Sequence, residues 1–228
     1  MNLLILPGGG SKDAENYRSV YTLLEDAAKE RGYKEIQVAH YPGQVDDKRK
    51  IIGEGTLTGS VKATSVLVKQ FADKGPFRII ARSFGCTVAL MAVKEAGLTN
   101  VKEIVLWGPF PFWGIWERFK KDFKTYCKKH SEKMGVNISE NYFDSEEPIE
   151  YHLLKYTCDT PIIISSGAGD KTECPPSFFN YLKEICIGKD NIRFVGPVDK
   201  AKHTMRPGDP GMEGYLNMLF ADYSKSKI

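Results

Sequence analysis

The sequence predicts an α/β fold in which a mostly parallel sheet of about six strands is flanked by helices and carries an inserted cap. Three observations support this prediction. Short apolar runs alternate with segments whose apolar residues recur at helical spacing. The apolar runs are continuous, which is typical of parallel strands that are buried on both faces. A segment of different character, residues 108–159, interrupts the alternation after the fourth apolar run.

The first half of the chain is predicted to alternate strictly between strands and helices. The apolar run at residues 3–6 stops at Pro7, which indicates a short buried strand. Apolar residues then recur every three or four positions until Gly32, which ends a helix. The same reasoning predicts strands at residues 3–6, 35–39, 77–81 and 101–107, and helices at residues 14–31 and 87–96. Residues 58–72 are predicted to form a further helix or a loop leading into one.

The alternation resumes after the interruption, with strands expected at residues 161–167 and 192–195 and helices at residues 177–185 and 211–223. The interruption, residues 108–159, falls at the carboxyl edge of the sheet, where open α/β sheets bind ligands. We interpret it as a cap inserted into a single domain that spans residues 1–228. The cap begins with the densest aromatic run in the chain, and four of its side chains are predicted to line a substrate pocket: Phe110, Phe112, Trp113 and Trp116. Packing of the cap onto the body is the alternative role for many of these aromatics.

Composition excludes several functional classes. The net charge is only +3, and acidic and basic residues are interspersed, so we expect no nucleic-acid partner. The five cysteines are scattered without metal-binding spacing, which argues against a zinc site and against a disulfide framework. No apolar run is long enough to span a bilayer, and the N-terminal run is too short for a signal peptide, so we expect a cytoplasmic protein.

The segment Ala81-Arg82-Ser83-Phe84-Gly85 joins the third strand to the following helix. A serine flanked by small residues at positions −2 and +2 fits a tight strand-to-helix turn that presents its hydroxyl outside the sheet. Ser83 is therefore the candidate nucleophile. The sequence does not indicate whether Arg82 faces the pocket or forms a structural ion pair.

A serine hydroxyl needs a base, and the base needs a group that orients it. Among the four histidines, His203 lies in a loop after the last strand, at the edge where Ser83 is expected. Asp170 follows the fifth strand within a glycine-containing loop at the same edge. Asp190 lies at the opposite edge, and Asp199 remains a rival for the orienting acid.

The glycine run at residues 8–10 follows the first strand and is predicted to form an oxyanion hole. The expected donors are the backbone N–H groups of Phe84 and of Gly9 or Gly10, because glycines let the backbone approach the substrate closely. A phosphate-binding loop is the alternative, but the run lacks both common phosphate-loop spacings.

Together, these segments resemble the α/β-hydrolase superfamily over nearly the whole chain outside the insertion. The resemblance rests on the glycine run, the Ser83 turn, Tyr41-Pro42-Gly43 after the second strand, Gly169-Asp170 and His203. It implies a triad of Ser83, His203 and Asp170 and a reduced α/β-hydrolase fold with a cap. The chain departs from the family pattern in two ways: Ala81 fills the first small position of the turn, and the first two strands of the usual sheet are missing.

The leading functional hypothesis is hydrolysis of a small-molecule ester or thioester through an acyl-enzyme. A peptidase or amidase that uses the same triad is one alternative, and a non-catalytic ligand-binding protein that kept the fold is another. We expect neither a cofactor nor a metal. The substrate, the acyl chain length and the oligomeric state are not readable from the sequence.

Overall fold

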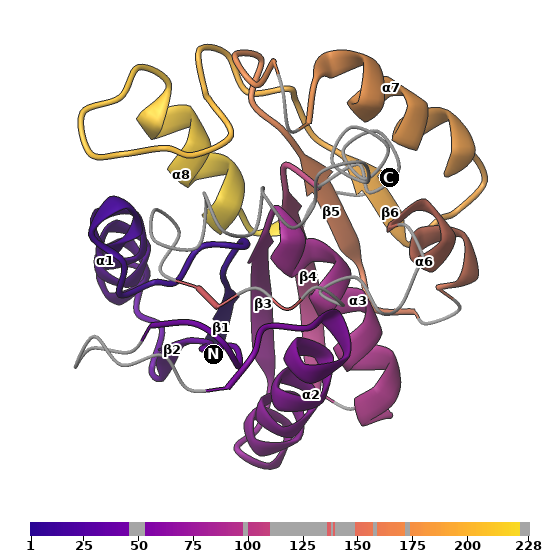
Figure 1. Cartoon of the computed structure of the whole chain (residues 1–228). Coiled ribbons are helices and arrows are strands. Elements are labelled where there is room, and N and C mark those ends of the chain that lie inside the picture. The colour runs from indigo at the N-terminus through magenta and orange to yellow at the C-terminus, as the bar shows by residue number, and fades with distance from the viewer. Residues whose placement is uncertain are drawn as a thin grey trace.

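The computed structural model describes residues 1–45, 53–97, 100–109, 136–137, 139, 149–156, 159–171 and 174–223. Within these residues, six strands form one parallel sheet in the order β2-β1-β3-β4-β5-β6 (Figure 1). The strands are β1 (Asn2–Leu6), β2 (Ile36–Val38), β3 (Phe77–Arg82), β4 (Val101–Trp107), β5 (Ile162–Ser165) and β6 (Ile192–Phe194). The helices are α1 (Glu15–Glu30), α2 (Leu57–Asp73), α3 (Phe84–Ala96), α6 (Ile149–Lys155), α7 (Pro176–Ile185) and α8 (Met212–Phe220). The predicted α/β architecture is confirmed.

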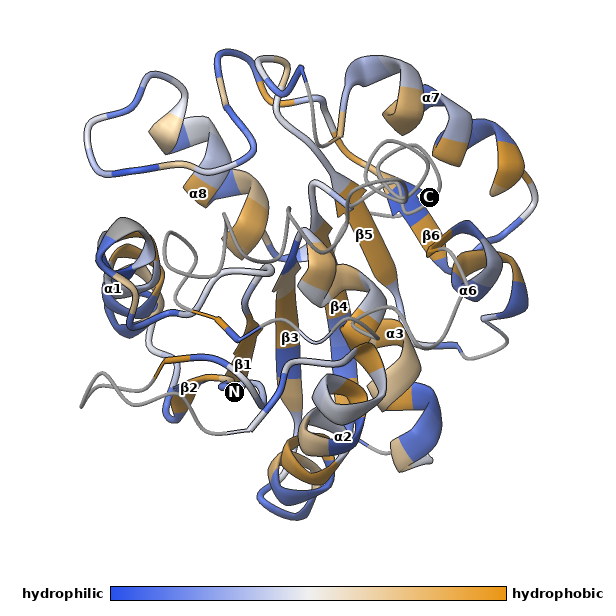
Figure 2. Cartoon of the chain, viewed as in Figure 1, coloured by the Kyte–Doolittle hydropathy of each residue, from blue (hydrophilic) through white to orange (hydrophobic). Residues whose placement is uncertain are grey.

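The helices cover both faces of the sheet. Helices α1 and α8 lie on one face, and α2, α3, α6 and α7 lie on the other (Figure 1). Successive strand residues alternate between these layers, so that Ile79 packs with α2 and α3 while Ile80 packs toward α1 and α8. Figure 2 shows the apolar strands between helices whose outer faces are polar. Burial on both faces explains why the strands read as continuous apolar runs.

The strand ends are aligned at the carboxyl edge. Leu6 of β1 pairs with Ala81 of β3, which in turn pairs with Leu106 of β4. The chain passes from β1 outward to β2 and then returns to β3 on the other side of β1. This reversal makes the β1/β3 boundary the switch point of the sheet, where open α/β folds bind ligands. The glycine run and Ser83 follow these two strands.

Helix α3 begins at Phe84, directly after the serine, whereas the sequence predicted a start at residue 87. The other predicted elements are found with boundaries shifted by a few residues. Only parts of the predicted cap, residues 108–159, belong to the described residues. One of these parts, α6, buries Ile149 and Leu153 in the core beside α3 and α7, so this stretch is part of the body's packing.

Another described part of the insertion is tied to the loop after β2. The Asn137 amide donates to the Gly43 carbonyl at 2.5 Å, and the Gly55 amide donates to the Asn137 carbonyl at 2.7 Å. Gln44 connects the loop after β2 to the glycine run, because its Nε2 donates to the Gly10 carbonyl at 3.3 Å. The insertion is therefore joined to the loop beside the candidate nucleophile. Within the described residues, no helix has the length and apolarity needed to cross a membrane.

Candidate active site

Ser83 occupies a sharp turn between β3 and α3. Its backbone lies at φ 51° and ψ −124°, a region that residues with a β-carbon rarely adopt. Serine commonly caps helix N-termini, yet the Ser83 side chain makes no capping hydrogen bond to α3. The hydroxyl is therefore not committed to the helix. The sequence-predicted turn is present, with Ser83 at its apex.

Gly85 allows this turn to lie against the end of β1. A β-carbon at Gly85 would overlap the Pro7 carbonyl oxygen and would lie 2.7 Å from the Leu6 carbonyl oxygen. The need for a small residue at this position is thus steric, because helix α3 starts directly against the backbone that leads into the glycine run. Any larger side chain would push the two segments apart.

The glycine run lies next to the serine. A β-carbon at Gly8 would be 3.2 Å from Ser83 Cβ and 3.8 Å from Ser83 Oγ. The Gly8 amide donates to the Tyr21 hydroxyl at 3.1 Å, so this N–H is already engaged. A β-carbon at Gly10 would meet the Tyr17 ring, with Cδ2 at 2.7 Å. The run therefore follows a tight path between α1 and the nucleophile turn.

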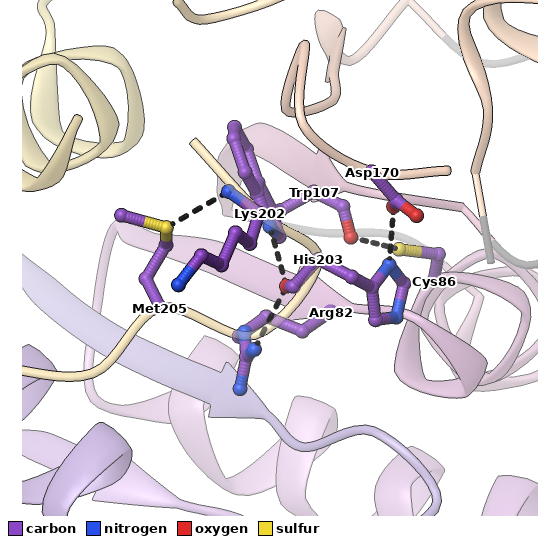
Figure 3. Close-up of polar contacts among 7 residues, drawn as sticks. All are labelled: Arg82, Cys86, Trp107, Asp170, Lys202, His203 and Met205. Atoms are coloured by element: carbon purple, nitrogen blue, oxygen red, sulfur yellow. Dashed lines mark hydrogen bonds and ion pairs between the residues drawn. The ribbon is translucent and has the colours of Figure 1, made fainter. Parts of the chain in front are cut away.

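His203 and Asp170 are paired at the same edge. His203 Nδ1 lies 2.7 Å from Asp170 Oδ2, with the histidine side chain 13% exposed and the aspartate side chain fully buried. Figure 3 shows the imidazole ring turned toward the carboxylate. The carboxylate accepts a hydrogen bond from Nδ1–H, and this fixes the neutral imidazole in the tautomer with an unprotonated Nε2.

Backbone contacts between two loops create this pair. The Gly169 amide donates to the Ala201 carbonyl at 2.8 Å, and the Val198 amide donates to the Ser166 carbonyl at 2.8 Å. A β-carbon at Gly167 would overlap the Ala201 carbonyl oxygen and lie 2.5 Å from its carbon. The glycines around Asp170 therefore allow the backbone to contact the loop that carries His203 closely, and they also allow the chain to turn.

Gly108, which follows β4, lies against the paired side chains. Its φ is +54°, and a β-carbon there would be 2.8 Å from His203 Nδ1 and 3.7 Å from Asp170 Oδ2. Gly108 was not among the residues predicted from the sequence. The available signal was a glycine directly after a strand at the carboxyl edge, and glycines are common at strand ends.

The Arg82 side chain lies on the face of the sheet that α1 and α8 cover. It is 3% exposed, and its Nη2 donates to the His203 carbonyl at 3.2 Å. The Trp107 Nε1 donates to the same carbonyl at 3.0 Å (Figure 3). This placement bears on the question that the sequence left open: the Arg82 side chain is buried in the layer of α1 and α8, and among the described residues it forms no ion pair.

Cys86, in the first turn of α3, is buried behind the turn. Its thiol donates weakly to the Ala81 carbonyl at 3.4 Å and to the Trp107 carbonyl at 3.6 Å. Burial raises the pKa of this thiol well above its ordinary value of 9.0. A protonated thiol in this position is inert, so the surroundings of Cys86 fit a structural role in packing.

The structure does not bring all the predicted residues into contact. No hydrogen bond joins Ser83 to His203, although both side chains are among the described residues. Catalytic hydrogen bonds of this kind are often long without substrate and tighten when it binds.

Phe84 is buried at the start of α3. The predicted pocket aromatics, Phe110, Phe112, Trp113 and Trp116, lie outside the described residues, as does most of the cap. Among the residues that the structure describes, no group of histidine, cysteine and carboxylate side chains is arranged to hold a metal.

No protein-family model matches the chain, and no curated protein sequence matches it either. Solved structures resemble it at low sequence identity. An esterase from Thermogutta terrifontis with bound malate gives a TM-score of 0.62 at 14% identity, covering 96% of this chain and 88% of that one. The mouse α/β hydrolase domain-containing protein 10 gives a TM-score of 0.63 at 14% identity, covering 96% and 87%. A deformylase from Pseudomonas putida gives a TM-score of 0.58 at 15% identity, covering 96% and 90%. These similarities show that the chain has the α/β-hydrolase fold.

Proposed function

We propose that this chain is a serine hydrolase that cleaves a small-molecule ester or thioester through an acyl-enzyme. The observation that carries the proposal is the His203–Asp170 pair, held at 2.7 Å at the sheet edge from which Ser83 emerges in a strained turn. A buried carboxylate that fixes the tautomer of a partly exposed histidine is the arrangement that a serine nucleophile requires. The similarity in fold to esterases and to an α/β hydrolase domain adds support.

In the proposed first half-reaction, Ser83 Oγ attacks the carbonyl carbon of the substrate. His203 Nε2 takes the serine proton as the new bond forms, and Asp170 stabilises the resulting imidazolium through its bond to Nδ1. The tetrahedral intermediate then collapses, His203 donates the proton to the leaving alcohol or thiol, and an acyl-Ser83 ester remains. In the second half-reaction, a water molecule gives a proton to His203 Nε2 as its oxygen attacks the acyl carbon. The bond between the acyl carbon and Ser83 Oγ then breaks, Oγ takes the proton back from His203, and the carboxylic acid is released.

The oxyanion that forms in each half-reaction needs backbone donors. We assign the Phe84 amide and the amide of Gly9 or Gly10 to this role. The Gly8 amide is engaged by Tyr21, and the glycine run approaches Ser83 closely. Loss of one such donor typically slows the reaction by about 10²–10³-fold. The aromatic residues at the start of the cap remain the predicted lining of the acyl or aryl pocket.

The test is active-site labelling with a fluorophosphonate, followed by mass-spectrometric mapping of the modified residue. The expected result is one label on Ser83, together with turnover of short p-nitrophenyl esters that Ser83→Ala abolishes. A labelled protein with the adduct on another serine, or wild-type turnover in Ser83→Ala, would contradict the proposal. A folded protein that resists labelling but binds an apolar ligand would favour the non-catalytic alternative.

An amidase that uses the same residues is the second candidate. The specific observation in its favour is the similarity in fold to a protein named as a deformylase. Matched pairs of p-nitrophenyl esters, thioesters and p-nitroanilides that share one acyl group discriminate the two. The ester or thioester assignment predicts much faster turnover of the ester and thioester than of the anilide.

A further inference from the structure

Arg82 is a buried cation that the proposed mechanism does not use. It is 3% exposed and follows Ala81 at the end of β3, next to Ser83. Among the described residues, no carboxylate forms an ion pair with it, and the buried Tyr215 of α8 is a neutral neighbour of the guanidinium. Burying a guanidinium without a counter-charge costs several kcal/mol. An apolar side chain of similar size would fill the space without this penalty.

Hydrogen bonds and a ring contact of the guanidinium offset part of the free-energy cost of burying it. Arg82 Nη2 donates to the His203 carbonyl at 3.2 Å, beside the Trp107 indole, which donates to the same oxygen (Figure 3). Arg82 Nη1 makes a long contact of 3.4 Å with the Tyr21 hydroxyl, and the guanidinium carbon lies 5.6 Å from the centre of the Tyr21 ring. The two ends of one planar group thus reach two different elements.

Each of these contacts leads to a different part of the proposed catalytic machinery. The His203 carbonyl belongs to the residue that would act as the base. The Tyr21 hydroxyl also accepts the Gly8 amide at 3.1 Å, and Gly8 lies against Ser83 at the start of the predicted oxyanion loop. A phenol oxygen has two lone pairs and accepts both donors. Arg82 is therefore bonded directly to the loop that carries His203 (residues 199–206, the base loop). Through Tyr21 it is also connected to the loop that contains the glycine run (residues 7–13, the oxyanion loop).

We propose that Arg82 is a positioning residue that holds the base loop and the oxyanion loop in register behind the nucleophile. This inference rests on the proposed hydrolase function. The planar fork of arginine suits two acceptors in separate elements, here helix α1 and the loop that carries His203, whereas the point charge of lysine or an apolar side chain does not. Misplacement of either loop by about 1 Å is enough to slow a positioned reaction by about 10²-fold.

The experiment compares Arg82→Met with wild type. The measured quantities are the rate constant for fluorophosphonate labelling of Ser83, kcat and KM for a p-nitrophenyl ester, the melting temperature, and amide hydrogen exchange in peptides that cover residues 7–13 and 199–206. We expect labelling and kcat to fall about 10²-fold with little change in KM. We also expect faster exchange in both peptides. The melting temperature should change little, because replacing a buried charge with an apolar residue is often neutral or stabilising.

A matched control is available on the same strand. Arg78 is 2% exposed on the same face of β3, but it lies at the opposite end and is paired with Glu103 at 2.7 Å. The double variant Arg78→Met/Glu103→Gln removes a buried arginine without orphaning its carboxylate. It should leave the labelling rate per folded molecule and the two exchange signals unchanged. Equal slowing in this control would reduce Arg82 to a structural residue and overturn the proposal.

If Arg82→Met fails to fold, Tyr21→Phe tests the connection from Arg82 through Tyr21 to the glycine run. This variant removes only the hydroxyl that accepts the Gly8 amide. We expect faster exchange over residues 7–13, unchanged exchange over residues 199–206, and slower labelling. Labelling within twofold of wild type in both variants would refute the positioning role. If wild type itself resists labelling, the hydrolase proposal fails, and the exchange data alone decide the loop-holding role: unchanged exchange in both peptides would refute it.

Discussion

The backbone at Ser83 makes a quantitative prediction about stability. At φ 51° and ψ −124°, a residue with a β-carbon carries strain that glycine does not. Such conformations cost about 1–3 kcal/mol. Replacing a residue with glycine also increases the freedom of the unfolded chain, which costs about 0.4–1 kcal/mol. Ser83→Gly should therefore be more stable than Ser83→Ala by about 1 kcal/mol.

The comparison between the two variants isolates the strain. Both lack the hydroxyl, so both should be inactive, and neither loses a capping bond because the serine side chain makes none to α3. They differ only in the β-carbon. In a chain of this size, 1 kcal/mol corresponds to roughly 2–4 °C in melting temperature.

The assay is urea unfolding followed by circular dichroism, supported by thermal melts of wild type and both variants under one set of conditions. We expect Ser83→Gly to have the highest unfolding midpoint of the three proteins with no change in the denaturant slope. Ser83→Ala should resemble wild type in stability, because alanine keeps the strained β-carbon. A Ser83→Gly variant that is no more stable than Ser83→Ala would refute the claim that the turn stores strain.

Three further predictions concern the surroundings of Ser83. Gly108→Ala should lower kcat/KM for an ester by about 10²-fold, because the new β-carbon would lie 2.8 Å from Nδ1 of His203. Gly32→Ala is the control: its φ is also positive, at +76°, but its new β-carbon would meet no atom within 4 Å. This control adds backbone strain alone and should keep full activity. Asp170→Asn should lower kcat by on the order of 10⁴-fold by favouring the wrong imidazole tautomer, whereas Asp199→Asn should have little effect in the same assay. Burial raises the pKa of the Cys86 thiol above 9.0, so the native state keeps a proton that the unfolded state loses, and stability falls as the pH rises past that value. The part of this loss that comes from the Cys86 thiol should be absent in Cys86→Ala when urea unfolding is measured at pH 8 and pH 10.

The pattern of the sequence was sufficient to predict the sheet. Continuous apolar runs that alternate with amphipathic helices leave few solutions other than a parallel sheet covered on both faces. The same pattern placed the candidate catalytic residues at one edge, because the carboxyl ends of parallel strands share an edge. The glycine run, Ser83, Asp170 and His203 each follow a different strand, and this order is visible in the sequence alone.

Contacts between segments far apart in the chain could not be predicted in this way. The pairing of His203 with Asp170, and not with Asp199, depends on backbone hydrogen bonds between two loops, which local sequence does not encode. The face of the sheet on which the Arg82 side chain lies depends on the alternation of side chains along β3. Its contacts depend on the acceptors in α1 and in the loop that carries His203. The sequence by itself therefore determined which residues reach the carboxyl edge of the sheet. The tertiary structure alone decided which of them touch, because that depends on loop paths fixed by packing across the whole domain.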